Sequence, residues 1–280
     1  PWSIFMRSIF TMMLAGCLLS TNLMATIIGE DNRETSTAND GHVTGIGVIF
    51  SRFTGKKNLF KCTATLIGQH FIITAAHCVF KLGKGGFAQK ISFVPGFSKQ
   101  IKNQQAQQYL IESSWVNRQF VSAEENGNPH SWHTDRSDIA ILQIKQQEEP
   151  FPGDRFGSKQ LIKDFDRIVD GQKYRGNFAS YPTDKPYTDA PWKETGCEYW
   201  APDAGAFYTY CDTAIGSSGG ALLAENNNII GIVSSFSMSR NYATRITSKL
   251  AKEIDAIVSG ENQQVEYFIF DNLLKHTGIN

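Results

Sequence analysis

The apolar segments of this chain are short, and their shortness most constrains the fold. They are rich in valine, isoleucine, threonine and phenylalanine and are bounded by glycine, asparagine or proline, which is typical of β-strands. Because long stretches with helical periodicity do not separate them, the pattern favours an antiparallel all-β sandwich or barrel over alternating strands and helices. The segments are VTGIGVIFSRF, CTATLIGQHFIITAAHCV, KISFVPGF, SDIAILQI, GALLAENNNIIGIVSSF and ATRIT, and ENNNIIG predicts a hairpin connection.

One segment near the C-terminus has a helical pattern instead. In TSKLAKEIDAIVSG, the side chains of Leu250, Ile254 and Ile257/Val258 fall on one face, and Gly260 is a typical helix end. We therefore expect a C-terminal helix. The polar tracts at residues 99–109 and 122–137 are predicted to be loops, and the sequence has no clear internal repeat or interdomain linker.

Size and charge set broad limits on function. A chain of 280 residues with 41% hydrophobic residues and 24 glycines can bury a substantial core, in one large domain or in two subdomains. Lysine plus arginine and aspartate plus glutamate both number 27, so the net charge gives no reason to expect a nucleic acid or an anionic membrane as partner.

The N-terminal region, residues 1–25, has the pattern of an export signal. A short basic start at Met6 and Arg7 precedes the apolar run SIFTMMLAGCLL, and the region ends at the small residue Ala25. Residues 1–5 precede the first methionine and are left out of the fold interpretation. We expect residues 26–280 to form the folded domain and the protein to be secreted or periplasmic.

Cys17 allows an alternative, because LAGC at residues 14–17 resembles the bacterial lipoprotein processing box. Lipidation at Cys17 would anchor the protein to a membrane, although the apolar run continues through Leu18 and Leu19. The other four cysteines would reach an oxidising compartment, where disulfides persist. They are Cys62, Cys78, Cys197 and Cys211, which allow three pairings.

Three motifs together suggest nucleophilic chemistry by a serine. A serine hydroxyl needs a general base, a group that orients the base, and donors for the developing oxyanion. GSSGG at residues 216–220 can supply a sharp turn, TAAHC places His77 after a strand, and Asp138 precedes the apolar strand IAIL. Each motif alone has a plain structural explanation: a glycine-rich turn, a structural histidine or a solvated cap. Their order along the chain, His77, Asp138, Ser218, is much more specific.

TAAHC, DIAIL and GSSGG resemble the motifs of chymotrypsin-like serine proteases, most closely those of the bacterial glutamyl endopeptidase family. The resemblance extends over about residues 27–247 and includes IIGEDNRE, CTATLIGQHFIITAAHCV, FVPG, CDTAIGSSGG and NIIGI. It implies two six-stranded antiparallel β-barrels of the chymotrypsin type, with the catalytic site between them and a C-terminal helix.

The resemblance also implies the role of each site residue. Ser218 would be the nucleophile, His77 the general base and then acid, and Asp138 the group that orients the imidazole. The main-chain N–H groups of Gly216 and Ser218 would form the oxyanion hole. Asp135 competes with Asp138 but lacks the following strand.

The same resemblance supports the disulfides Cys62–Cys78 and Cys197–Cys211. We expect no cofactor and no metal, because the other histidines lack ligand spacing with cysteine or carboxylate. The expected partners are protein or peptide substrates, and the expected state is a monomer.

Specificity is left open between two interpretations of Asp212. It lies six residues before Ser218, the spacing at which trypsin-like enzymes carry an aspartate that binds arginine or lysine, but it could equally have a structural role. Val233 occupies the position of a histidine that reads glutamate in the glutamyl endopeptidases, so glutamate specificity is not expected. Thr213, Ser234 and Ser235 are also expected at the substrate pocket.

Ser217 occupies the position of the aspartate that receives a new N-terminus in animal digestive members, so that route of activation is not expected. The sequence predicts an exported serine endopeptidase that acts through an acyl-enzyme. The alternatives are a non-catalytic adhesin or binding module on the same scaffold, and an esterase.

Overall fold

The computed structural model describes residues 26–37, 40–96, 107–128, 132–145, 150–163, 168–185, 191–203, 205–237, 239–261 and 265–276. The predictions for the export signal and for Cys17 lie outside these residues, as does most of the predicted loop at 99–109. None of the helices in the described ranges has the length and apolar character that a membrane span requires.

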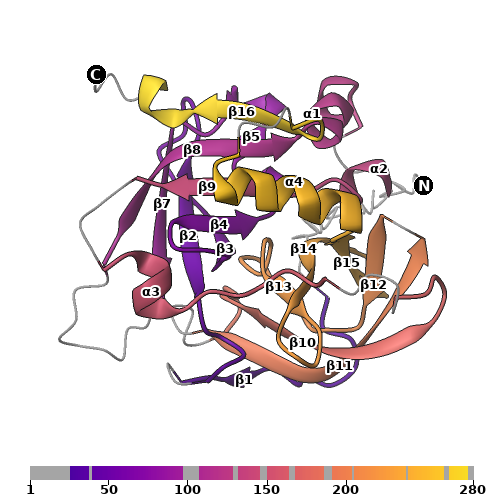
Figure 1. Ribbon diagram of the computed structural model, residues 1–280. Helices are drawn as coiled ribbons and strands as arrows, with labels where there is room; N and C mark the ends of the chain where they lie inside the picture. The colour runs from indigo at the N-terminus through magenta and orange to yellow at the C-terminus, as the bar shows by residue number, and fades with distance from the viewer. Residues whose placement is uncertain are drawn as a thin grey trace, which may run out of the picture.

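Six antiparallel strands close the first barrel (Figure 1). The closure is made by β8, which pairs with β7 and with β9, so that the ring of neighbours is complete. The strands are β2 (Ile46–Arg52), β3 (Phe60–Leu66), β4 (Phe71–Thr74), β7 (Lys90–Pro95), β8 (Tyr109–Asn117) and β9 (Ala140–Ile144). Their inward side chains, including Phe93 and Ile72, are fully buried, which stabilises the barrel through the hydrophobic effect.

The second barrel repeats this closure with β11, which pairs with β10 and β12. Its strands are β10 (Lys173–Ser180), β11 (Trp192–Asp203), β12 (Ala206–Thr209), β13 (Ala221–Leu223), β14 (Ile229–Ser237) and β15 (Arg240–Arg245), and β1 (Glu34–Thr35) adds to the outer edge of β11. The predicted pair of six-stranded antiparallel barrels is confirmed. The predicted hairpin joins β13 to β14, with Asn227 in the left-handed conformation at φ 64°.

The C-terminal helix is α4 (Ser248–Ser259), as its periodicity predicts. The side chain of Thr247 accepts a hydrogen bond from Leu250 N at its start, and Gly260 ends it with φ 71°. In Figure 1 the chain then continues to the yellow strand β16 (Phe268–Asn272), which pairs with β8 on the outside of the first barrel. A short 3-10 helix, η4 (Leu273–His276), follows.

The prediction of a loop over residues 122–137 is wrong in part. The structure has α1 (Arg118–Glu125) and α2 (Trp132–Asp135) here. The Asn117 side chain accepts a hydrogen bond from Gln119 N and so caps α1, whereas only Phe120 and Val121 of that helix are buried. A single buried turn within a polar segment gives too weak a periodic pattern for the sequence to indicate this helix. The remaining short elements are η1 (Ala76–Cys78), β5 (Phe80–Lys81), η2 (Leu82–Lys84), β6 (Gly86–Phe87) and α3 (Pro152–Phe156).

Candidate active site

His77 and Asp138 meet because their strands are antiparallel neighbours. β4 pairs with β9, with Thr74 opposite Ala140, so the end of β4 and the start of β9 lie at the same end of the barrel. His77 follows β4 in η1, and Asp138 comes two residues before β9. Two residues that are far apart in sequence are thereby brought to one point.

The Asp138 carboxylate holds His77 through two contacts, one to the imidazole and one to the main chain. Its Oδ2 lies 2.6 Å from His77 Nδ1, and its Oδ1 accepts a hydrogen bond from the main-chain N–H of His77 at 2.8 Å. Ser234 Oγ donates a further hydrogen bond to Oδ2 at 2.6 Å. A carboxylate at Nδ1 assigns the imidazole proton to that nitrogen, which leaves the Nε2 lone pair available as a base.

Asp138 is buried, with 2% of its surface exposed. Burial acts to raise the pKa of this carboxyl, but the charge of His77 and the hydrogen bonds from His77 and Ser234 hold the pKa below its usual value. Asp138 is therefore the negative partner that an imidazolium at this position requires.

Asp135 lies beside this pair without a hydrogen bond to the imidazole among the described contacts. It accepts hydrogen bonds from Ser235 Oγ at 2.6 Å and from Ser234 Oγ at 3.3 Å. Burial raises the pKa of the Asp135 carboxyl, and the negative charge of Asp138 adds to this effect. The structure thus puts Asp138, and not its competitor, against the histidine.

The two adjacent serines differ in environment. Ser217 is buried; its Oγ accepts a hydrogen bond from Ala214 N at 3.1 Å and lies 2.9 Å from Ser180 Oγ. Ser218 is half-buried, in the turn that leads into β13. The Ser217 hydroxyl is part of the internal packing, and Ser218 is the serine that a substrate could reach.

Thr63 of β3 fixes the serine turn to the first barrel. Its main-chain N–H donates to the carbonyl oxygen of Ser218 at 2.9 Å, and its hydroxyl donates to the carbonyl oxygen of Gly216 at 2.8 Å. Gly219 packs so closely here that a Cβ on it would lie 2.2 Å from Thr63 O. Only glycine allows this approach, which its φ of +80° also favours.

The peptide before Gly216 is oriented by a hydrogen bond on its other side. The carbonyl oxygen of Ile215 accepts from Thr183 N at 2.7 Å, so the N–H of Gly216 points the opposite way. Neither this N–H nor that of Ser218 donates to an acceptor among the described residues. Two main-chain donors are therefore available next to the Ser218 side chain, as an oxyanion hole requires.

Asp212 is occupied by the N-terminal segment. Its Oδ1 accepts from Ile28 N at 2.8 Å and its Oδ2 from Asn32 N at 3.0 Å, and 1% of its surface is exposed. Thr26 docks nearby, since its carbonyl oxygen accepts a hydrogen bond from the Asn241 side chain at 3.1 Å. Sequence reasoning did not find this docking, because it joins positions 180 or more residues apart.

The other residues expected at the pocket are spread around the same region. Thr213 Oγ1 donates to Asn241 Oδ1 at 2.9 Å. Val233 has 2% of its surface exposed and packs in the core, while its main chain pairs with Gly219 and Gly220. Ser234 and Ser235 follow it on β14 and direct their hydroxyls at Asp138 and Asp135 as described above.

The family model of the trypsin-like peptidase domain matches residues 62–232 of this chain. The chain belongs to the trypsin-like peptidase family. It is a serine endopeptidase of the chymotrypsin-like fold, as the motifs predict.

Three solved structures are similar to this trypsin-like peptidase over most of their length. A Glu endopeptidase in complex with MPD is 20% identical over 83% of this chain and 99% of its own, with a TM-score of 0.64. The protease Anisep from Arthrobacter nicotinovorans is 19% identical over 76% and 93%, with a TM-score of 0.57. The thermostable serine protease AL20 from an extremophilic microorganism is 20% identical over 81% and 100%, with a TM-score of 0.55. A search of curated proteins found no match.

Both predicted disulfides of the peptidase are confirmed. Cys62 is bonded to Cys78 next to the histidine, and Cys197 to Cys211 before the serine turn. The sulfurs of Cys62 and Cys78 and a nitrogen of His77 lie within 4.8 Å of one another. The two sulfurs are joined to each other, however, so they are not the thiolates that a zinc site needs.

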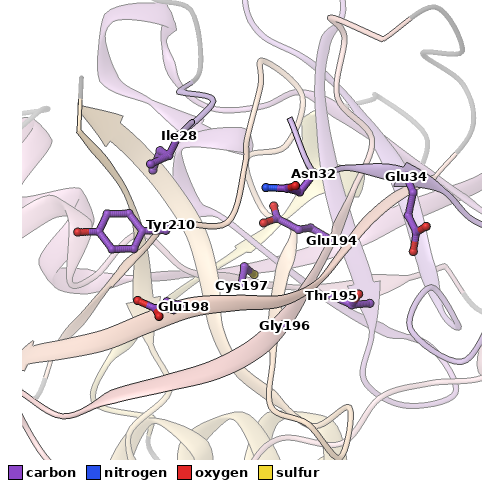
Figure 2. Close-up of a pocket in the computed structure, with 9 residues that line it drawn as sticks. All are labelled: Ile28, Asn32, Glu34, Glu194, Thr195, Gly196, Cys197, Glu198 and Tyr210. Carbon is purple, nitrogen blue, oxygen red and sulfur yellow. The ribbon is translucent and has the colours of Figure 1, made fainter. Parts of the chain in front are cut away.

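The structure also has a cavity of ≈ 600 Å³ whose lining does not include His77, Asp138 or Ser218. Figure 2 shows the side chains of Asn32 and Glu194 extending toward one another there, between the N-terminal segment and β11. Burial raises the pKa of the Glu194 carboxyl to about 7, although its Oε2 accepts a hydrogen bond from Asp212 N. The lining residues are Ile28, Asn32, Glu34, Glu194, Thr195, Gly196, Cys197, Glu198 and Tyr210.

Proposed function

We propose that this protein is an exported serine endopeptidase in which Ser218, His77 and Asp138 form a catalytic triad. The observation that supports this most directly is the Asp138 carboxylate at 2.6 Å from His77 Nδ1. It keeps the proton on Nδ1 and leaves Nε2 as the base on the imidazole.

The reaction proceeds in two halves. Ser218 Oγ attacks the carbonyl carbon of the scissile peptide bond while His77 Nε2 accepts the hydroxyl proton, and the carbonyl oxygen becomes an oxyanion. The N–H groups of Gly216 and Ser218 stabilise that charge, and Asp138 stabilises the imidazolium. The tetrahedral intermediate then collapses: the C–N bond breaks, the amine leaves with the proton from His77, and an ester to Ser218 remains. Water hydrolyses this ester with the same base.

We propose that Asp212 is structural and does not bind a substrate cation. Both of its carboxylate oxygens accept main-chain hydrogen bonds from the N-terminal segment, and only 1% of the residue's surface is exposed, so the carboxylate is closed to a substrate cation. Val233 is apolar and cannot pair with a glutamate side chain. A preference of this pocket for an uncharged residue, either apolar or polar, fits both observations.

The proposal that the protein is exported rests on the N-terminal pattern and on the two disulfides, which persist in oxidising compartments. N-terminal sequencing of the protein recovered from culture medium tests it. An end near Ala25 supports signal removal, and an acylated Cys17 at the N-terminus supports the lipoprotein alternative.

A fluorophosphonate probe, which esterifies activated serines, tests the triad. The wild type and Ser217→Ala are expected to be labelled, and Ser218→Ala is not. Ser217→Ala is the matched control because it removes the neighbouring hydroxyl from the same turn. Labelling that persists in Ser218→Ala would refute the assignment, and a folded wild type that is never labelled would favour a binding module. Comparing peptide with simple ester hydrolysis separates an endopeptidase from an esterase.

A further inference from the structure

Two hairpins of the first barrel carry an unbalanced positive charge. Residues 53–62 connect β2 to β3 and include the start of β3; they contain Lys56, Lys57 and Lys61. Residues 80–88, around β5 and β6, contain Lys81 and Lys84. Neither segment contains an aspartate or a glutamate, although lysine plus arginine equals aspartate plus glutamate in the whole chain. We call these five lysines the lysine rim.

The two hairpins lie against each other. Lys81 Nζ is 3.8 Å from the centroid of the Phe60 ring, and Lys84 Nζ is 5.2 Å from the same ring. Gly85 approaches Thr54 so closely that a Cβ on it would lie 3.0 Å from Thr54 Oγ1. Cation–π contacts therefore hold two ammonium groups over one aromatic ring.

That ring borders the catalytic histidine. The Phe60 and His77 rings are 6.3 Å apart between centroids, in an edge-on arrangement. Phe60 comes from β3, the strand whose Thr63 binds the serine turn, whereas Ser234 of β14 contacts the histidine's partner Asp138. If the substrate residues before the scissile bond lie along β14, the residues after the bond, which leave as the amine product, extend toward β3 and the lysine rim.

The two ammonium groups over the Phe60 ring, those of Lys81 and Lys84, form no ion pair among the described residues. Burial and the positive charge of Lys84 lower the pKa of Lys81 to about 8, although the negative charges of Asp138 and Glu124 act in the opposite direction. Glu124 of α1 reaches this hairpin, but its Oε2 accepts a hydrogen bond from Leu82 N. A carboxylate brought by a ligand would therefore be stabilised here.

We propose that the lysine rim is a subsite for acidic side chains on the leaving-group side of the scissile bond. It would select protein substrates that carry aspartate or glutamate one to a few residues after the cleavage point. The inference rests on the proposed endopeptidase function, because that function gives the substrate its direction across His77.

Quenched fluorescent peptides test this directly. Three peptides share every residue up to the scissile bond and carry Glu-Glu, Gln-Gln or Lys-Lys at the second and third positions after it. The wild type is expected to show a kcat/KM about three- to tenfold higher for Glu-Glu than for Gln-Gln, with Lys-Lys lowest. The preference should shrink between about 0.01 M and 0.15 M ionic strength, where the Debye length falls from about 30 Å to about 8 Å.

Two double variants and one control assign the effect to the rim. Lys81→Gln with Lys84→Gln is expected to remove most of the preference for Glu-Glu, and Lys56→Gln with Lys57→Gln at the exposed hairpin tip to reduce it. The second pair keeps the test available if the first pair fails to fold. Lys252→Gln removes an exposed lysine of α4, outside both hairpins, and should preserve the preference.

A binding measurement separates the rim from catalysis. Ser218→Ala is titrated with a fluorescent Glu-rich peptide and with its Lys-rich counterpart, and anisotropy is recorded. Tighter binding of the acidic peptide that is lost in the rim variants supports the subsite, even if the triad assignment fails the probe test. Equal kcat/KM for the three peptides together with equal binding of the two probes would overturn the subsite and leave the triad untouched.

Discussion

Thr63 of the first barrel donates its main-chain N–H to the carbonyl oxygen of Ser218 at 2.9 Å, although Ser218 belongs to the second barrel. Its hydroxyl adds a second link, because Thr63 Oγ1 donates to Gly216 O at 2.8 Å and accepts from Tyr181 N at 2.9 Å. The turn that carries the proposed nucleophile is thus fixed by the barrel that carries the proposed base.

Thr63→Val should reduce both stability and turnover. The change keeps the shape of the side chain but leaves Gly216 O and Tyr181 N without this partner, at a cost of about 1–3 kcal/mol in the free energy of unfolding. We expect kcat to fall at least tenfold, since Gly216 carries one of the oxyanion donors. Urea denaturation and ester hydrolysis measure the two effects.

Thr65→Val is the matched control for Thr63→Val. Thr65 lies on the same strand and is buried, but its hydroxyl has no hydrogen-bond partner among the described residues. This change should be neutral or stabilising. Equal losses in both variants would show that the Thr63 hydroxyl has no special role.

Gly216→Ala should nearly abolish turnover. Gly216 has φ +92°, and a Cβ would lie 2.5 Å from Tyr181 O, so the peptide that presents its N–H must move. Loss of one oxyanion donor typically lowers kcat by about 10²- to 10³-fold. Gly171→Ala is the control, because Gly171 has a similar φ of +81° but a Cβ added there would meet nothing within 4 Å. Normal kcat in Gly216→Ala would contradict this donor's role.

Asp212→Asn should weaken the docking of the N-terminal segment. An amide can accept from only one of Ile28 N and Asn32 N through its single oxygen, so we expect a loss of about 1–2 kcal/mol in unfolding free energy. Cleavage-site profiling should find no preference for arginine or lysine before the scissile bond, in either the wild type or the variant. The exposed Asp255→Asn is the control for stability. A basic preference that disappears in Asp212→Asn would restore the trypsin-like role.

Glu194 should make stability fall as pH rises. Because burial raises its pKa from 4.5 to about 7, the folded protein keeps a proton over this range that the unfolded chain has lost. The free energy of unfolding should therefore decrease by about 3 kcal/mol between pH 4.5 and pH 7 through this group. Glu194→Gln should remove that decrease, as measured by urea denaturation at pH 5 and pH 8. Glu198→Gln, at the same cavity, should keep it.

The sequence predicted the barrels, and it led to the proposed site residues, because these signals are local. β4 (FIIT) and β9 (AILQI) are mostly apolar, and His77 and Asp138 lie close to them in sequence, so motif and strand reinforce each other. β11 alternates buried and partly buried residues over much of its length, but Lys193, Glu194 and Glu198 interrupt the apolar pattern and conceal the strand.

Contacts between distant segments could not be predicted in the same way. β16 pairs with β8 across about 150 residues of sequence, and the five residues of the pairing include Asp271 and Asn272, which are not typical of strands. Asp212 shows the same limit, since its spacing from Ser218 suggested a pocket floor and only the fold reveals its main-chain partners.

The docking of Thr26 has a practical consequence for producing the protein. Its side chain donates to Ser237 O on β14, and its carbonyl oxygen accepts from Asn241 on β15. A purification tag joined directly before Thr26 would therefore leave the surface beside β14, the strand along which the substrate is proposed to lie. Recombinant preparations should carry the tag after the C-terminus or begin with a removable leader, so that assays report the enzyme and not its tag.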